Sequence, residues 1–202
     1  RRTKGQIAKE FGIEPLADKL LADPTLVPET EAQAFINAAL NYGDTKAVLD
    51  GAKHILMERF AENADLLARL RTFLTEHSDV TAKLVPGKEN EGAKFRDYFD
   101  HREPLKAAPS HRALAMFRGR NEGFLTLALE MPNQEEGAPH PAEGMIAAHA
   151  GIKNEKRAAD AWLAEVVRWT WRVKLLTHLE TDLLGEIKGS AELEAIKVFA
   201  DN

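Results

Sequence analysis

Residues 161–176 constrain the fold of this chain more than any other segment, because their apolar side chains recur at helical spacing. One face of the expected helix carries Trp162, Val166, Trp169, Val173 and Leu176. Further apolar side chains widen that face, namely Leu163, Val167, Trp171 and Leu175. Only a narrow polar stripe remains, made of Glu165, Arg168 and Arg172. Neighbouring elements must cover such a helix on most sides, so we expect it to be the spine of the fold.

Helical spacing also fills most of the remaining sequence. Thr3 and Asp44 can each start a helix, and Gly12 can end the first one. The expected helices follow Thr3 and cover residues 14–22, 29–40, 45–62, 64–74, 91–99, 110–120, 142–150 and 183–198. With 202 residues and 44% apolar content, the chain can bury a substantial core. We therefore predict a mainly α fold with one multihelical domain over residues 1–202.

Two short segments break this helical pattern. Residues 79–84 alternate apolar and polar side chains, and the best partner for that strand is residues 124–130. Since two strands alone cannot bury enough surface to be stable, we predict a short two-stranded β insertion in a helical body. Residues 133–141 combine glycine and proline with polar side chains, which predicts a flexible surface loop.

Composition limits the classes of function. The chain has no cysteine, which removes disulfides and thiolate chemistry and is consistent with our expectation of a cytoplasmic protein. Its net charge of -5 provides no chain-wide attraction to nucleic acid or to an anionic membrane. Charged residues interrupt the most apolar stretch, 161–176, so it cannot span a bilayer. The chain starts at Arg1 without methionine, and helical spacing still runs near Asn202, so we expect an internal fragment of a longer chain.

No arrangement of residues predicts a catalytic, metal or cofactor site. The histidines are scattered, without the paired spacing that a metal site on a helix needs. No glycine-rich loop precedes a helix in the pattern that binds phosphates. Ser110 beside His111 suggests a nucleophile and its base, but adjacent helical side chains point about 100° apart, so Ser110 is better explained as a helix cap. We expect no enzymatic activity.

Residues 6–13 are similar to the first helix and turn of DNA-binding helix-turn-helix units. A recognition helix needs polar or basic side chains at its N-terminus, where it enters the major groove. The second helix here begins with Glu14 and carries Asp18 one turn later, and two carboxylates would repel phosphates. We therefore do not expect this pair of helices to read DNA.

The segment 94–120 is strongly basic. It holds seven Lys and Arg residues against three Asp and Glu residues, which gives a local net charge of +4. Aromatic side chains interleave with these cations, a mixture suited to single-stranded nucleic acid through base stacking and phosphate contacts. The candidate nucleic-acid-binding residues are Arg96, Arg102, Lys106, Arg112, Arg118 and Arg120. The alternative, which helical spacing favours, has the arginines paired with nearby acids and places in the core Phe95, Phe99, Leu114 and Phe117.

Two stretches are distinctive enough to compare with a known family. They are residues 91–99, Glu-Gly-Ala-Lys-Phe-Arg-Asp-Tyr-Phe, and residues 109–120, Pro-Ser-His-Arg-Ala-Leu-Ala-Met-Phe-Arg-Gly-Arg. With residues 1–8, 52–62 and 160–169 in the same order, they resemble the Tex family of bacterial transcription accessory proteins. The resemblance covers nearly the whole chain and is less distinctive at residues 133–142 and over the last two dozen residues.

The resemblance implies a helical region that precedes a nuclease-like fold lacking a working catalytic set. Tex proteins resemble the eukaryotic elongation factor that travels with RNA polymerase, and their clearest nucleic-acid contact is through an S1 RNA-binding barrel. Neither this barrel nor the family's helix-hairpin-helix elements occur in the sequence, so no functional residue is carried over from them. We expect nucleic acid as a partner mainly through those domains, and RNA polymerase or its associated proteins as further partners. The chain is then a helical scaffold in transcription regulation, and the alternative is a protein-docking module without nucleic-acid contacts of its own.

Overall fold

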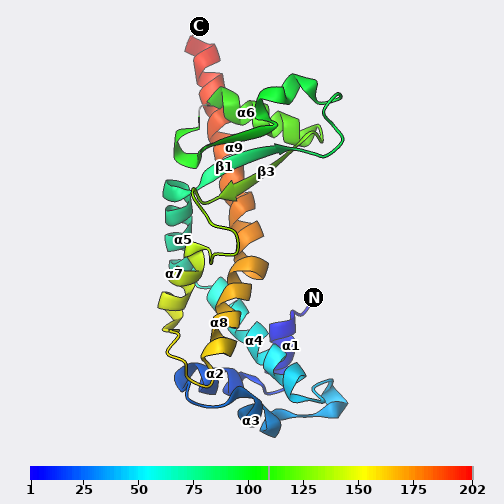
Figure 1. The fold of residues 1–202 in the computed structure, drawn as a ribbon, viewed down its shortest axis with the longest axis vertical. Coiled ribbons are helices and arrows are strands. Elements are labelled where there is room, and N and C mark those ends of the chain that lie inside the picture. The colour runs from blue at the N-terminus through cyan, green and yellow to red at the C-terminus, as the bar shows by residue number, and fades with distance from the viewer. Residues whose placement is uncertain (109, 202) are drawn as a thin grey trace. The chain divides into compact units, whose positions relative to one another are not determined.

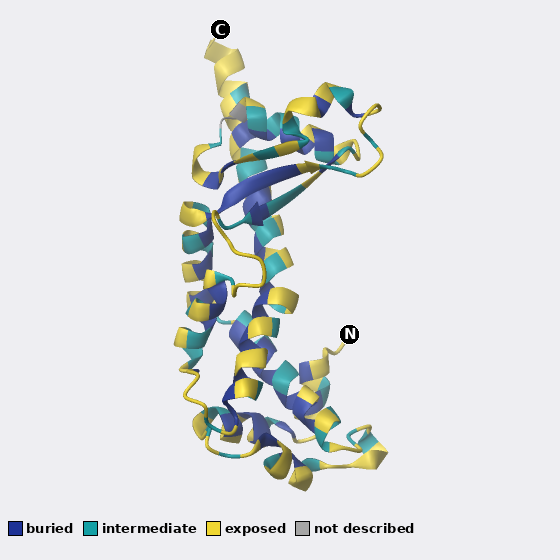
Figure 2. Cartoon of the chain, viewed as in Figure 1, coloured by how far each residue is buried: buried dark blue, intermediate teal, exposed yellow. Residues whose placement is uncertain are grey.

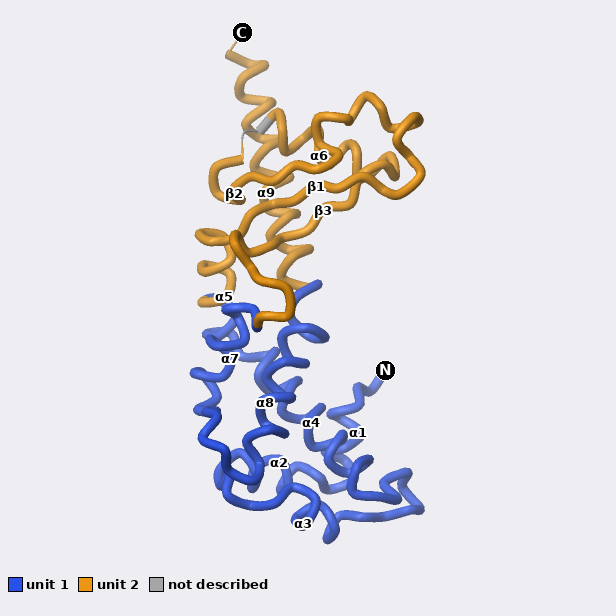
Figure 3. The backbone as a smooth tube through the Cα atoms, viewed as in Figure 1, with its two compact units in different colours: residues 1–68, 139–177 blue, residues 69–138, 178–202 orange. Residues whose placement is uncertain are grey.

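The computed structural model describes residues 1–108 and 110–201 and divides into two compact units. Unit 1 comprises residues 1–68 and 139–177, and unit 2 comprises residues 69–138 and 178–202 (Figure 3). Each unit is therefore assembled from two stretches that are far apart in the sequence. The mainly α fold is confirmed, whereas a single domain over the whole chain stays a prediction.

Unit 1 is helical and is organised around α4, Thr45–Ala61. Its other elements are α1 (Lys4–Glu10), α2 (Glu14–Ala22), α3 (Pro28–Ala32), η1 (Gln33–Phe35), η2 (Ala38–Leu40), α7 (Pro141–Ala150), α8 (Asp160–Trp169) and η5 (Thr170–Leu175). Asp44 caps α4 as predicted, because its carboxylate accepts a hydrogen bond from the Ala47 amide at 2.8 Å. The helix packs against α1, α2, α3 and α8 (Figure 1). Its buried side chains, which include Ile55 and Leu56, form the centre of this core.

A carboxylate from α4 holds the first turn of α1. Glu58 accepts hydrogen bonds from the Gly5 amide at 2.8 Å and from the Thr3 hydroxyl at 2.5 Å. A side chain at position 5 would overlap the Glu58 carboxylate, so only glycine permits this approach. Glu14 and Asp18, at the start of α2, both pair with Arg59 of α4, at 3.5 and 2.7 Å. The two helices that are similar to a helix-turn-helix unit are therefore tied to the core of unit 1.

The predicted spine contains a π-helical turn. α8 ends at Trp169, η5 is the π-helical segment, and α9 continues from Leu176 to Asp201. Within the same region the buried Thr170 hydroxyl donates a hydrogen bond to the Val166 carbonyl at 2.7 Å, a contact that often bends helices. The sequence pattern gave no sign of this turn.

The π turn changes which side chains of the spine are buried. Val166 and Thr170 are buried in this stretch, and so are four residues that recur at every fourth position, namely Leu163, Val167, Trp171 and Leu175. Because an α-helix has about 3.6 residues per turn, side chains at every fourth position rotate gradually around the helix axis. A π-helical turn contains more residues, so it brings such side chains back to the same face. Val173 was predicted on the apolar face, but it is 55% exposed. The prediction of one continuous apolar face was therefore wrong at this position.

Unit 2 contains a three-stranded antiparallel sheet in the order β2-β1-β3. The strands are β1 (Asp79–Leu84), β2 (Asp100–Pro104) and β3 (Leu125–Glu130), and the first four residues of β1 are buried (Figure 2). The predicted pairing of residues 79–84 with 124–130 is confirmed, with Val80 opposite Leu129. The prediction of only two strands was wrong. β2 has the sequence Asp-His-Arg-Glu-Pro and lacks the apolar alternation that would have predicted a strand; it lies at an edge of the sheet, where charged side chains discourage pairing with another chain.

Helices complete unit 2, some of them between the strands in the sequence and others before and after the sheet. They are the greater part of α5 (Ala64–His77), η3 (Ala93–Tyr98), η4 (Leu105–Ala107), α6 (Ser110–Asn121) and most of α9 (Leu176–Asp201). The amide of Leu129 on β3 donates a hydrogen bond to Glu180 of α9 at 3.0 Å. Residues 131–140 contain no helix or strand and are mostly exposed, in agreement with the predicted surface loop, and α7 begins at Pro141.

Candidate nucleic-acid interface

All six candidate cations lie in unit 2, on four different elements. Arg96 is on η3, Arg102 is on β2, Lys106 is on η4, and α6 carries Arg112, Arg118 and Arg120. α6 packs against both β3 and η3, so the two distinctive stretches of sequence form neighbouring parts of one structure. Gly119 permits this packing, because a side chain there would overlap Leu125 of β3.

Two of the six cations are compensated by carboxylates. Arg102 pairs with Glu130 at 2.7 Å and with Asp79 at 3.1 Å, which joins the edge strand β2 to both other strands of the sheet, β3 and β1. The Arg112 Nε atom lies 3.3 Å from Oε1 of Glu103, a buried carboxylate on β2. Lys94, the other cation of this segment, pairs with Glu122 at 2.8 Å. These side chains stabilise the unit, so little of their charge is available to a ligand.

The other four candidates have no carboxylate partner among the described residues. Arg96 and Arg118 are exposed, and the Arg96 Nε donates only to the backbone carbonyl of Ala93, at 3.3 Å. Lys106 is also exposed. Arg120 lies over the ring of Phe117, with 4.9 Å from its guanidinium carbon to the ring centroid. Uncompensated cations of this kind can contact phosphates without regard to base sequence.

The aromatic side chains of the segment are less available than the cations. Phe95 and Phe117 are buried, as the alternative interpretation predicted, and so they cannot stack on bases. Tyr98 and Phe99 are half-buried, and the Tyr98 ring already contacts the His101 ring edge to face at 5.3 Å. In segment 94–120 the cations are therefore more accessible to a ligand than the aromatic rings are.

The described part of the chain offers little other chemistry. No group of His, Asp and Glu residues within that part could hold a metal ion. None of its helices combines the length and hydropathy that crossing a membrane requires. Pro109 and the side chain of Ser110 lie outside the described residues, so the predicted cap at this position is not tested.

Histidine side chains of unit 1 provide two perturbed groups. Burial lowers the pKa of His54 and of His140 below the ordinary value of 6.5. The Nδ1 of His140 accepts a hydrogen bond from the Ala142 amide at 2.9 Å and caps α7, which requires the neutral ring. The Nδ1 of His54 is buried and has no hydrogen-bond partner. Neither histidine is part of a set of converging groups that resembles a catalytic site.

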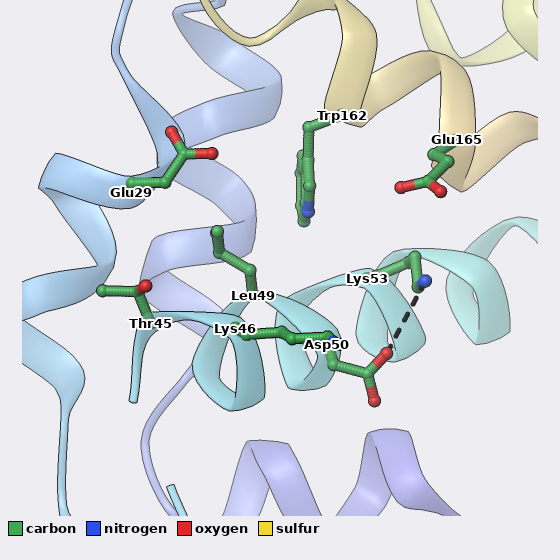
Figure 4. A pocket seen from close by; sticks show the side chains of 8 residues that line it. All are labelled: Glu29, Thr45, Lys46, Leu49, Asp50, Lys53, Trp162 and Glu165. Carbon is green, nitrogen blue, oxygen red and sulfur yellow. Dashed lines mark ion pairs between the residues drawn. The ribbon is translucent and has the colours of Figure 1, made fainter. Parts of the chain in front are cut away.

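Unit 1 also contains a pocket of 310 Å³ that the sequence analysis missed (Figure 4). Its walls come from three helices, and the lining includes Glu29 of α3, Leu49 of α4 and Trp162 of α8. Glu29 and Trp162 are more than a hundred positions apart in the sequence, so no local motif could have predicted that they line one pocket. Trp162 had been assigned to the apolar face of the spine, but it is only half-buried.

Comparison with known proteins places nearly all of the chain in one group. A family model described as Tex central region-like matches residues 23–199. Protein YhgF of Escherichia coli (strain K12) is 54% identical over 204 residues, and Protein tex of Bordetella pertussis is 50% identical over 208 residues. Transcriptional accessory protein Tex of Neisseria gonorrhoeae is 46% identical over 202 residues. Each match covers 100% of this chain but 26% of the relative, so the chain spans about a quarter of the length of these relatives.

Proposed function

The chain belongs to the Tex family, and from this membership we propose that it is a helical scaffold within a transcription accessory protein that binds nucleic acid. Its own contribution to that binding is an auxiliary surface in unit 2, formed by Arg96, Lys106, Arg118 and Arg120. The observation that carries this proposal is the lack of carboxylate partners for these four cations within the described residues, beside Arg102 and Arg112, which have them. The name of the Neisseria gonorrhoeae relative supports the link to transcription.

The proposed binding is electrostatic and therefore sensitive to salt. Each phosphate contact on a single strand contributes about -0.7 to the slope of log K against log salt concentration. We expect the double variant Arg96→Ala/Arg118→Ala to bind single-stranded RNA more weakly, with a slope shallower by about 1.4. Fluorescence anisotropy with a labelled oligonucleotide at several salt concentrations measures both quantities.

A matched variant separates a local surface from a general loss of charge. Arg168 and Arg172 are exposed arginines of unit 1, and no ion pair joins either of them to the described residues. Arg168→Ala/Arg172→Ala removes the same charge and should leave affinity and slope close to those of the unchanged chain. Equal effects of the two double variants would contradict the proposed surface.

A second function, docking of a protein, is favoured by apolar side chains near the end of α9. Leu193, Ile196 and Phe199 recur at helical spacing and are 70%, 65% and 86% exposed. Surface of this kind marks interaction sites when it is contiguous. RNA polymerase or proteins bound to it are the partners that we propose for this role. Binding of such a partner should resist salt and should persist in Arg96→Ala/Arg118→Ala.

We propose no catalytic role for this chain and a cytoplasmic location for the protein that contains it. The sequence contains no motif that predicts a catalytic site, and no group of three or more His, Asp and Glu residues in the described part of the chain could hold a metal ion. A screen for hydrolysis would overturn this view if it found turnover that a single substitution abolished.

A further inference from the structure

Trp162 projects from α8 into the pocket of unit 1 (Figure 4). The buried side chain of Leu49, from α4, lies close to the indole and gives the pocket an apolar floor. Glu29 of α3 and Glu165 of α8 lie on opposite sides of the ring in this view. The pocket therefore combines an aromatic face with two carboxylates that come from different helices.

The charges of this pocket are not balanced. Its carboxylates are Glu29, Asp50 and Glu165, and its ammonium groups are Lys46 and Lys53, so the lining has a net charge of -1. Lys53 and Asp50 pair at 3.6 Å. Glu29 and Glu165 are exposed, and neither forms an ion pair with any described residue. One additional cation would neutralise the pocket.

The aromatic ring of the pocket also lacks a cation. Elsewhere in the chain, Lys94 lies 5.2 Å from the Phe95 ring centroid and Arg120 lies 4.9 Å from the Phe117 ring centroid. Indole binds cations more strongly than a phenyl ring does. No cation of the described residues lies over the Trp162 ring, although carboxylates flank it. An accessible aromatic face beside carboxylates that form no ion pair is suited to a cationic ligand.

We propose that this pocket binds an arginine side chain of a partner protein, with the guanidinium stacked on Trp162 and attracted electrostatically by Glu29 and Glu165. A guanidinium is planar, stacks on aromatic faces and stays charged, so it combines the aromatic contact with the attraction to the carboxylates. The pocket volume of 310 Å³ is near the lower end for small-molecule sites and suits one long side chain. The proposal concerns unit 1 and is independent of nucleic-acid binding by unit 2.

The test uses the 202-residue chain and the peptide acetyl-Gly-Arg-Gly-amide. The probe is the indole N–H resonance of Trp162 in a nitrogen-15 correlation spectrum, assigned with the variant Trp162→Phe. We expect a saturable shift with a dissociation constant in roughly the millimolar range, because one side chain provides all of the contacts. The peptide with citrulline in place of arginine has nearly the same shape without the charge, and it should bind at least about ten times more weakly.

Charge variants then assign the contacts. Glu29→Gln and Glu165→Gln should each weaken binding by about three- to tenfold, whereas Lys46→Gln should tighten it, because it removes a repulsive charge. General damage to the fold could not weaken binding in the glutamate variants and tighten it in the lysine variant. Glu192→Gln, on an exposed position of α9 in unit 2, is the matched control and should change nothing.

Three results would overturn the proposal. They are the absence of a saturable shift, equal binding of the arginine and citrulline peptides, and unchanged affinity in both Glu29→Gln and Glu165→Gln. Spermidine tests whether the cation belongs to a free polyamine. Tighter binding of spermidine than of the arginine peptide would assign the pocket to a small molecule rather than to a protein partner.

Discussion

In unit 1 a single long helix, α4, packs against several other helices through apolar side chains, whereas unit 2 contains a sheet in which one of the two edge strands, β2, is polar. Unit 1 has exposed ion pairs, such as Arg59 with Asp18, and it also buries a carboxylate, Asp160, whose partner Arg157 lies three positions earlier in the sequence. Unit 2 buries the carboxylate of Glu103 on β2, and its partner Arg112 comes from a different element, α6. The comparison teaches that a buried carboxylate can be compensated by a neighbour in the sequence or by an arginine that the fold brings from another element.

The largest effect should come from the core of unit 1. Leu56 of α4 is fully buried, and Leu56→Ala should lower the free energy of unfolding by about 2–5 kcal/mol through lost burial and the cavity that remains. The three tryptophans, Trp162, Trp169 and Trp171, all belong to unit 1, so urea unfolding followed by their fluorescence reports on this unit. Val173→Ala, at an exposed position, should stay within about 0.5 kcal/mol of the unchanged chain. Equal losses in the two variants would refute the role of α4.

A smaller effect should come from the buried carboxylate of unit 2. Oε1 of Glu103 lies 2.8 Å from the His101 Nε2 and 3.3 Å from the Arg112 Nε. Glu103→Gln removes the charge that both partners face, and it should lower the free energy of unfolding by about 1–3 kcal/mol.

Circular dichroism can measure that loss, since unit 2 contains no tryptophan. The matched control is Glu122→Gln, which breaks the exposed pair with Lys94 and should cost no more than about 1 kcal/mol. If the control destabilised the chain as much as Glu103→Gln did, burial of the carboxylate would not be the cause.

The smallest effect should be a difference in pH dependence between the units. Burial lowers the pKa of His140 below 6.5, so its neutral form favours the folded state, and stability is lost as pH falls below that value. In unit 2, burial raises the pKa of Glu180 above 4.5, so its protonated form favours the folded state, and stability is lost as pH rises above that value. The contributions of the two side chains therefore have opposite signs.

Two substitutions test these signs. His140→Asn keeps an acceptor for the Ala142 amide but does not titrate, so it should reduce the loss of stability below pH 6.5. Part of the loss should remain in this variant, because burial also lowers the pKa of His54. Glu180→Gln should reduce the decline just above pH 4.5. Urea midpoints across this pH range measure both, and unchanged profiles would show that neither side chain is coupled to folding.

The sequence predicted what depends on short-range periodicity. α4 and its cap at Asp44 follow from apolar spacing and from one side-chain hydrogen bond, and both were confirmed. The pairing of β1 with β3 was predicted because both strands alternate in the usual way. β2 was missed because its side chains are charged, and it is a strand only through its hydrogen bonds with β1. The π turn was missed because no residue pattern marks it.

The candidate site was predictable only in part, because sequence gives charges but not their partners. Arg102 and Arg118 are equally basic in the sequence, yet Arg102 is compensated by Asp79 and Glu130, which lie more than twenty positions away on either side. No local rule identifies those partners. The same holds for the pocket around Trp162, whose residues α3, α4 and α8 bring together.

The assembly of unit 1 from residues 1–68 and 139–177 affects how it can fold during synthesis. When residues 1–68 leave the ribosome, α4 can pack against α1, α2 and α3, but the apolar side chains that face α8 and η5 must wait for about a hundred further residues. At about 5–20 residues per second, that delay is roughly 5 to 20 s. Throughout this interval the nascent chain exposes the side of α4 that α8 and η5 later cover, and chaperones bind apolar surface of this kind. Unit 1 therefore cannot complete its core until its second stretch, residues 139–177, has been made.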